Sequence, residues 1–365
     1  MRIAFVTTQS DSMGGSHVHV RDVSTALTKE GHDVMVFVGG TGPFTEQLAA
    51  NGVAFHSLTH MVRPLKPGED IKAIRELKDV LLAFKPDIVS THSSKAGIIG
   101  RLAGDRAKLP TLFTAHGWSF TEGVGRSAAI YERVERMVAR KGGTIVCVAE
   151  ADRQLAIDRR VARSEQLVTI YNGMPDFPER ANPGVGTPMI VSVARLDTQK
   201  DHPTLFRALS LLKDRDWTLE LVGGGSRTEE FQGLARELGI LERITFHGSQ
   251  PNVRPMLERA AMFALISNYE GFPRSTLEAM RTALPVVVSD VGGSREALVE
   301  GETGFSVPRG DANAVAKAIG KLLDSPDKRV EMGLKGRQRY EDEFTFGAMF
   351  AKTKKVYEDV IQMAR

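Results

Sequence analysis

Short runs of β-branched and other apolar residues alternate with longer stretches of helical periodicity along most of this chain. Runs that are apolar throughout indicate strands buried on both faces, as in a parallel sheet that helices cover. The alternation therefore predicts an α/β protein built from right-handed βαβ units. The expected strands are 3–7, 33–38, 88–91, 111–115 and 144–149 in the first half, and 189–194, 217–222, 244–247, 262–266 and 285–289 in the second.

The alternation is interrupted once, by a segment that holds four prolines, 174–188. Such clusters are typical of linkers, and 365 residues are long for one core but sufficient for two. We therefore expect two doubly wound Rossmann-like domains that face a cleft. Their expected bounds are 1–172 and 188–343, with a linker at 173–187 and a docking helix at 344–365 that crosses back to the first domain.

The composition is that of a soluble globular protein, with 42% hydrophobic and 25% charged residues. No apolar run approaches the roughly 18 residues of a membrane-spanning helix, and the first residues enter a strand pattern without a signal-peptide pattern. The one cysteine, Cys147, lies in an apolar run, which predicts a buried strand residue. A net charge of +3 without basic, aromatic-rich stretches argues against a nucleic-acid partner. A cytoplasmic protein is the expectation.

Two glutamates flank the expected start of a helix in the second half. Glu270 follows the strand 262–266, and Glu278 lies inside the helix, for which Ser275 or Thr276 is the expected N-cap. A helix N-terminus favours phosphate because its first N–H groups are unpaired, and a carboxylate accepts both hydrogens of a diol. The pattern fits a nucleotide or sugar site, but a solvated loop followed by a surface helix would show the same spacing.

Two cations, Arg195 and Lys200, flank a loop at the end of the strand 189–194. A guanidinium fork and a point charge together suit a pyrophosphate. Two ordinary surface cations would give the same pattern.

A pair of glycines, Gly14 and Gly15, follows the first strand, where a bare backbone can approach a phosphate or sugar closely. A dinucleotide site would need G-x-G-x-x-G and an acidic residue after the second strand, and neither is present. His116 follows the strand 111–115, at the edge where ligands bind in such sheets. A structural histidine is the alternative there.

Two patterns raise the question of a metal. Asp214 and Asp216 form a D-x-D, but they fall between a helix and a strand, where acidic turn residues are common. His17 and His19 would point to different faces of a helix. No metal site is therefore expected.

Taken together, these motifs resemble those of glycosyltransferase family 4, which are retaining enzymes of the GT-B fold. The resemblance follows the order of nearly the whole chain, and the stretches 92–97 and 116–120 are similar to members that build capsule or exopolysaccharide. The shared motifs are Gly14-Gly15, His116-Gly117, Asn172-Gly173, Arg195 with Lys200, Gly223 to Gly225, His247-Gly248, Glu270 with Glu278, and Gly292 to Glu296.

This resemblance implies a hexosyltransferase that moves a sugar from a nucleotide diphosphate donor, with UDP expected, to a saccharide or lipid-linked saccharide acceptor. It implies no cofactor and no metal, and a leaving diphosphate that accepts the acceptor's proton. The implied catalytic residues are His116, Glu270, Arg195 and Lys200. The implied donor-binding residues are Gly14, Gly15, Arg195, Lys200, Glu270, Gly271, Phe272, Arg274, Ser275 and Glu278. Pro273 stands where the family often has glycine and lacks an N–H, which leaves the donor sugar open.

The helical pattern at 126–141 places Ile130, Val134, Met137 and Val138 on one stripe and arginines elsewhere. A basic amphipathic surface fits contact with anionic lipid, and a helix that covers a sheet is the alternative. Three other functions fit parts of the sequence: a nucleotide-sugar epimerase or hydrolase, a nucleotide-sugar sensor without enzymatic activity, and a dehydrogenase, which the missing acidic residue disfavours.

Overall fold

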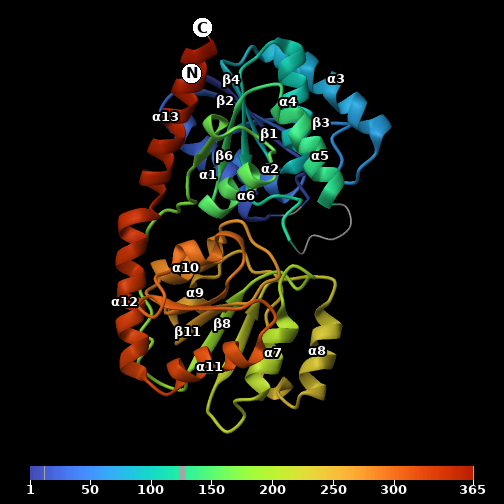
Figure 1. Cartoon of the computed structure of the whole chain (residues 1–365). Coiled ribbons are helices and arrows are strands. Elements are labelled where there is room, and N and C mark those ends of the chain that lie inside the picture. Colours follow the sequence, from blue (N-terminus) through green and yellow to red (C-terminus); the bar gives the residue numbers. More distant parts are fainter. Residues whose placement is uncertain (12, 123–127, 365) are drawn as a thin grey trace. The chain divides into compact units, whose positions relative to one another are not determined.

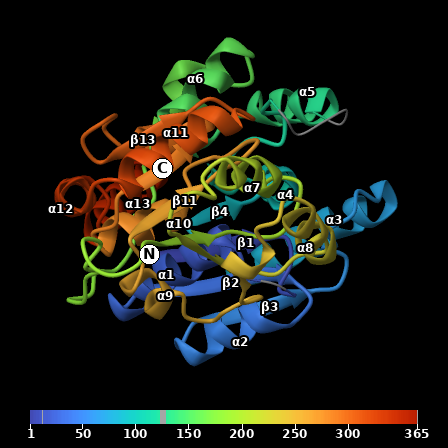
Figure 2. The same ribbon diagram turned by 90° about the horizontal axis from the view of Figure 1, so that it is seen from below.

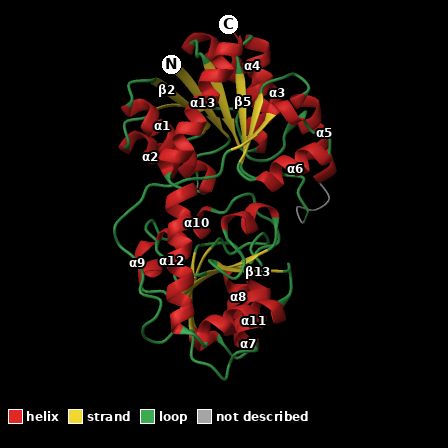
Figure 3. Cartoon of the chain, turned by 60° about the vertical axis from the view of Figure 1, so that its left-hand side comes forward, coloured by secondary structure: helices red, strands yellow, loops and turns green. Residues whose placement is uncertain are grey.

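The computed structural model describes residues 1–11, 13–122 and 128–364, which form two compact units (Figure 1). The first contains residues 1–172 together with the chain from Met349 onward, and the second contains Gly173–Ala348. Each is a parallel sheet covered by helices, as Figure 3 shows by secondary structure.

The first unit has a seven-stranded sheet in the order β3-β2-β1-β4-β5-β6-β7. The order reverses between β1 and β4, which pair in parallel from Ile3 against Ile88. The strands are β1 (Arg2–Thr7), β2 (Asp33–Gly39), β3 (Ala54–Leu58), β4 (Ile88–His92), β5 (Thr111–Ala115), β6 (Thr144–Cys147) and β7 (Leu167–Thr169). The helices are α1 (Gly15–Lys29), α2 (Pro43–Ala50), α3 (Pro67–Phe84), α4 (Ser94–Ala107), α5 (Ala128–Ala139) and α6 (Glu150–Asp158).

The second unit has a six-stranded sheet in the order β10-β9-β8-β11-β12-β13, which reverses between β8 and β11. Its strands are β8 (Met189–Val193), β9 (Thr218–Val222), β10 (Ile244–Phe246), β11 (Met262–Leu265), β12 (Val286–Ser289) and β13 (Gly304–Val307). Its helices are α7 (His202–Ser210), α8 (Thr228–Glu237), α9 (Arg254–Glu258), α10 (Arg274–Arg281), α11 (Ala312–Leu323) and α12 (Pro326–Glu343).

The core of the second unit lies between its sheet and the helices α7, α8 and α11, which Figure 2 shows from below. Phe206 of α7 and Phe231 of α8 are fully buried, and their rings meet edge to face with centroids 6.3 Å apart. Ile190 and Leu219 of the sheet complete this core. Strands with apolar side chains on both faces are buried in this way, as the sequence predicts.

The last helix, α13 (Phe346–Ala364), packs along the first unit. Tyr357 is 1% exposed, and its ring meets that of Phe5 on β1 edge to face at 6.3 Å. Lys354 forms an ion pair of 2.9 Å with Glu30, which follows α1. The C-terminal helix therefore packs with the sheet of the first unit.

The proline-rich segment that begins the second unit is packed rather than free. Ala181 donates its N–H to Thr282 O at 2.9 Å, and the hydroxyl of Tyr340 on α12 donates to Met174 O at 2.7 Å. Arg329 of α12, which is 1% exposed, donates to Pro183 O at 2.5 Å. These bonds hold the segment against α10 and α12. Among the described residues, no helix is both long and apolar enough to cross a membrane.

Candidate active site

A buried ion pair connects the loops that follow β8 and β11. The Lys200 ammonium contacts Glu270 Oε1, and the two side chains are only 11% and 6% exposed. Ser267, just beyond β11, donates its hydroxyl to the same carboxylate oxygen at 2.6 Å. Because β8 and β11 are neighbours at the point where the strand order reverses, their carboxyl ends bring these loops together.

Gln199 joins Arg195 to this pair. Its side-chain carbonyl accepts a hydrogen bond from Arg195 Nη2 at 2.9 Å, and its amide donates to Glu270 Oε2 at 3.4 Å and to Tyr269 O at 3.0 Å. The Arg195 side chain is 59% exposed and also pairs with Asp197 at 3.2 Å. The site therefore combines a buried cation held by a carboxylate with an exposed guanidinium. Gln199 is missing from the sequence prediction, and its only signal is its place between the two cations.

The α10 helix begins earlier than the sequence predicts. Its N-cap is Pro273, with an extended backbone at φ −71° and ψ 119°, so the expected N-cap at Ser275 or Thr276 is wrong. Proline fits this position because it needs no N–H there. Arg274 and Ser275 are thus in the first turn, where their backbone N–H groups lack helical acceptors. The unpaired N–H groups at the helix start therefore lie two to three residues closer to Glu270 in the sequence than predicted.

The other predicted residues around the start of α10 make packing contacts and hydrogen bonds within the second unit. Phe272 is 4% exposed and packs on Phe344 with ring centroids 5.3 Å apart, and Gly271 O accepts the N–H of Gly293 at 2.8 Å. Arg274 Nη1 donates to Gly173 O at 3.2 Å. Glu278 is half-buried. Burial raises the pKa of its carboxyl, and the nearby Arg274 and Arg281 act against that rise.

Glycines let the backbone close around this site. Gly292 has φ +51°, and a Cβ there would lie 1.9 Å from Glu270 O. A Cβ on Gly225 would lie 2.1 Å from Leu196 O, beside Arg195. These glycines, which the resemblance placed in the motifs, are thus needed for close backbone approach to the two loops that carry the charged residues.

In the first unit, Gly14 and Gly15 are the N-cap and first residue of α1. A Cβ on Gly14 would come no closer than 3.7 Å to another atom, so packing within this unit does not require glycine there. His17 accepts the Gly14 N–H at Nδ1 and faces Gln9 O with Nε2, and burial lowers its pKa.

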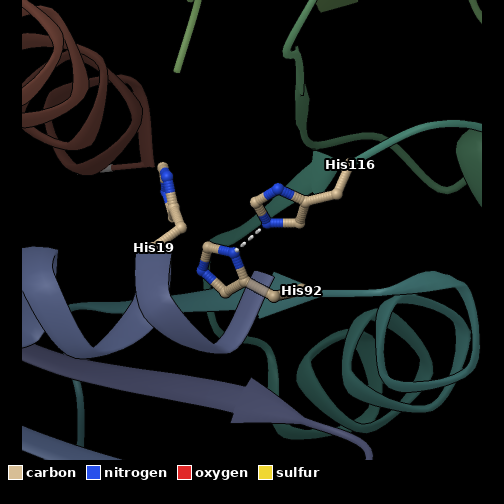
Figure 4. Close-up of side chains that lie close together, drawn as sticks. All are labelled: His19, His92 and His116. Carbon is tan, nitrogen blue, oxygen red and sulfur yellow. Dashed lines mark hydrogen bonds between the residues drawn. The ribbon is translucent and has the colours of Figure 1, made fainter. Parts of the chain in front are cut away.

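His116 follows β5 and lies against two other histidines (Figure 4). Its Nε2 is 3.1 Å from Nδ1 of His92, the last residue of β4, and its ring meets that of His19 edge to face at 4.9 Å. Burial first, and repulsion from His116 second, hold the pKa of His92 well below its usual value. Within the described part of the chain this trio is the one group of nitrogen, sulfur or carboxylate ligands compact enough for a metal ion, with one nitrogen of each within 4.8 Å. His17 and His19 diverge as expected, but the sequence does not reveal that His19 meets His92 and His116.

Comparison with known proteins identifies the family and the fold. Residues 14–173 match the family of glycosyl transferase 4-like domains, and residues 175–339 match glycosyl transferases group 1. The chain is 30% identical to D-inositol 3-phosphate glycosyltransferase from Nocardia farcinica, over 88% of this chain and 80% of that protein. It is 27% identical to the O-antigen biosynthesis glycosyltransferase WbnH from Escherichia coli, over 93% of this chain and 95% of that one.

The structure of Anabaena HepE in complex with UDP and glucose superposes with a TM-score of 0.83 at 18% identity, covering 98% of this chain and 99% of that one. Two Rossmann-like domains with these sheets define the GT-B fold. The chain belongs to glycosyl transferases group 1, in glycosyltransferase family 4, and is an enzyme of the hexosyltransferase class.

Replacement of Gly292 by alanine should disrupt the Glu270 loop. The new Cβ would overlap Glu270 O, and the positive φ adds about 1–2 kcal/mol of backbone strain. We expect turnover with the donor to fall more than tenfold. Gly301→Ala is the matched control, because Gly301 has φ +75° and open space around its Cβ position, so it carries the strain without the clash. Equal activities of the two variants would show that the contact with Glu270 is unimportant.

Proposed function

We propose that this enzyme transfers a hexose from a UDP-sugar to an acceptor hydroxyl, with retention at the anomeric carbon and without a metal, in the synthesis of cell-surface polysaccharide or glycolipid. The observation that carries the proposal is the buried Lys200–Glu270 pair linked through Gln199 to Arg195. The relatives agree with it, since one is named for O-antigen biosynthesis and one was solved with UDP and glucose.

In this proposal, Lys200 and Arg195 stabilise the charge that develops on the diphosphate as the sugar leaves. A desolvated ammonium interacts more strongly with that charge than a surface cation does. The backbone N–H groups at the start of α10 add dipole and hydrogen bonds to the same anion. These groups would supply the positive charge that a divalent ion supplies to D-x-D enzymes. Asp214 and Asp216 are exposed just before β9.

Glu270 would accept hydrogen bonds from the donor sugar, with help from the backbone of Gly271, Phe272 and Arg274, and Glu278 would bind the ribose diol. In the reaction, the bond from the anomeric carbon to the diphosphate oxygen breaks, and the bond to the acceptor oxygen forms on the same face. The acceptor's proton passes to the departing diphosphate oxygen. From the first unit, Gly14 and Gly15 would contribute to donor binding, and His116 would contact the sugar.

The α5 helix supports a peripheral contact with anionic lipid at the cytoplasmic face of a membrane. The predicted apolar stripe is wrong as a packing face, because Val138 is buried with Glu135 and Ala139, whereas Ile130 and Met137 are 63% and 55% exposed. The exposed Arg133 lies between Ile130 and Met137 at helical spacing, and Arg140 continues that face. Arg126 falls outside the described residues. Exposed apolar and basic side chains on one face are typical of helices that lie on anionic membranes.

Binding and stereochemistry test the donor and the reaction together. UDP should raise the melting temperature of the protein more than GDP does, because a ligand that binds only the folded state stabilises it. With a UDP-hexose, the NMR spectrum of the first product should show the donor's anomeric configuration, and added EDTA should leave the rate unchanged. An inverted product would refute retention, and free sugar as the only product would refute transfer to an acceptor. A rate abolished by EDTA would refute the absence of a metal.

Replacement of Lys200 by alanine should lower kcat by roughly 10²–10³, which is typical for loss of a group that stabilises transition-state charge. Glu270 would keep a buried carboxylate without its cation, so the unfolding midpoint must be measured in parallel. Lys213→Ala, at an exposed lysine of the same unit, is the control and should keep wild-type turnover. A folded Lys200→Ala protein with wild-type turnover would remove this mechanism.

Reversal of the charges at Arg133 and Arg140 to glutamate should weaken sedimentation with phosphatidylglycerol vesicles by more than about tenfold, because each basic residue near an anionic surface contributes about 1 kcal/mol. Neutral phosphatidylcholine vesicles should bind neither protein. The matched control reverses two exposed lysines of α13, Lys352 and Lys355, and should keep the binding. Wild-type protein that stays in the supernatant with anionic vesicles would exclude the lipid contact.

A further inference from the structure

A buried chain of hydrogen bonds leads from the C-terminal helix to His116. The Tyr357 hydroxyl on α13 lies 2.8 Å from Ser90 Oγ, which lies 3.0 Å from Nε2 of His92 on the same strand, β4. Nδ1 of His92 lies 3.1 Å from Nε2 of His116. Tyr357, Ser90 and His92 are at most 1% exposed, so water does not compete along the chain.

The donor and acceptor in each of these hydrogen bonds follow from the buried hydroxyl of Tyr357, at one end of the series. Tyr357 carries one phenolic hydrogen, and among the described residues its hydroxyl has Ser90 Oγ as its one hydrogen-bond partner. A buried donor left without an acceptor costs about 1–3 kcal/mol, so this hydroxyl donates to Ser90. Ser90 also carries one hydrogen, and the other hydrogen-bond partner of its Oγ among the described residues is Nε2 of His92. That buried hydrogen is therefore satisfied by donation to Nε2 of His92.

The protonation of both histidines follows in turn. His92 is fully buried and its pKa lies well below the usual value, so its ring is neutral and carries one N–H. Because Nε2 accepts from Ser90, that N–H is at Nδ1 and donates to Nε2 of His116. Because Nε2 of His116 accepts this hydrogen bond, the ring hydrogen of His116 is at Nδ1.

We propose that Tyr357, Ser90 and His92 are positioning residues that hold His116 in the Nδ1–H tautomer. Nδ1 of His116 is then a hydrogen-bond donor and not a base. If the proposed function holds, this N–H group would donate a hydrogen bond to a hydroxyl or ring oxygen of the sugar. Only this step rests on the proposed function. The C-terminal helix thereby contributes directly to the chemistry of the first unit, through a residue far from His116 in the sequence.

The His19, His92 and His116 cluster itself favours this interpretation over a metal site. A metal ion takes a lone pair from each ligand nitrogen. The hydrogen bond of 3.1 Å places one hydrogen between Nδ1 of His92 and Nε2 of His116, so an ion bound by this pair of nitrogens would have to displace it. The ring of His19 meets both neighbours, at centroid distances of 5.5 Å and 4.9 Å, and so limits their rotation.

The test reads the tautomer directly. In the full-length protein labelled with ¹⁵N-histidine, long-range ¹H–¹⁵N correlation spectra distinguish protonated from unprotonated ring nitrogens, and the signals of His116 are identified by their loss in His116→Asn. We expect Nδ1–H and a bare Nε2 for His116. In Tyr357→Phe the ratio of Nε2–H to Nδ1–H should rise roughly fivefold, the equilibrium equivalent of one neutral hydrogen bond. Ser90→Ala should shift it in the same direction.

Tyr340→Phe is the matched control. Tyr340 is also fully buried, and its hydroxyl donates to a backbone carbonyl, Met174 O, at 2.7 Å in the second unit. This variant loses a comparable hydrogen bond and should keep the wild-type tautomer. His116 with Nε2–H in the wild type would overturn the proposal. So would an unchanged tautomer in both Tyr357→Phe and Ser90→Ala, or a spectrum that changes when EDTA is added.

The result is separable from the proposed function. The spectra are recorded without substrate, and UDP should raise the melting temperature of Tyr357→Phe as much as that of the wild type, because the substitution leaves the residues around Lys200 intact. Absence of that rise in the wild type would count against the UDP donor and leave the tautomer result standing. A wild-type tautomer that contradicts the prediction would leave the transferase proposal standing.

Discussion

The constraint on which both units depend is the reversal of strand order in a parallel sheet. The connections that follow the two strands on either side of the reversal run to opposite faces of the sheet. This leaves a crevice between the carboxyl ends of the two strands. In the second unit this edge lies between β8 and β11, where Lys200 and Glu270 meet. In the first it lies between β1 and β4, and His92 is the last residue of β4. The polar groups of each unit gather at the edge where the strand order reverses.

Most of the fold could be predicted from the sequence because the buried strands are apolar on both faces. The exceptions show the limit of that signal. The edge strand β3 has one buried side chain, Leu58, and its remaining positions resemble a loop. Helix α12 buries only two large nonpolar side chains, Met332 and Tyr340, and its other buried residues are Arg329, Gly333, Gly336 and Arg337. A Cβ on Gly333 would lie 2.1 Å from Ala283 O, so this helix packs by close backbone approach, which hydrophobic periodicity does not report.

The sequence indicates charged residues next to strand ends, and the structure joins three of them, Arg195, Lys200 and Glu270, in one hydrogen-bonded group. The site was not predictable where a contact joins residues that are distant in sequence. Tyr357 fits the apolar stripe of α13, and nothing in its local pattern indicates a bond to Ser90. Gln199 connects Arg195 with Glu270 by hydrogen bonds. It carries no charge, so the charge pattern of the sequence does not reveal it. Such residues become visible only when the hydrogen bonds of buried polar groups are followed from one partner to the next.

The Lys200–Glu270 ion pair affects how the site would bind a nucleotide-sugar donor. A buried cation without a counter-ion would be costly, because burial removes its hydration. Glu270 is paired with Lys200 before any anion is present, while Ser267 and Gln199 hold the carboxylate from two sides. On the proposed function, an arriving diphosphate shares Lys200 with Glu270 rather than recruiting a mobile side chain from solvent. The carboxylate that positions the cation is then also the group that meets the sugar, so binding of the sugar and stabilisation of the leaving group are coupled through one contact.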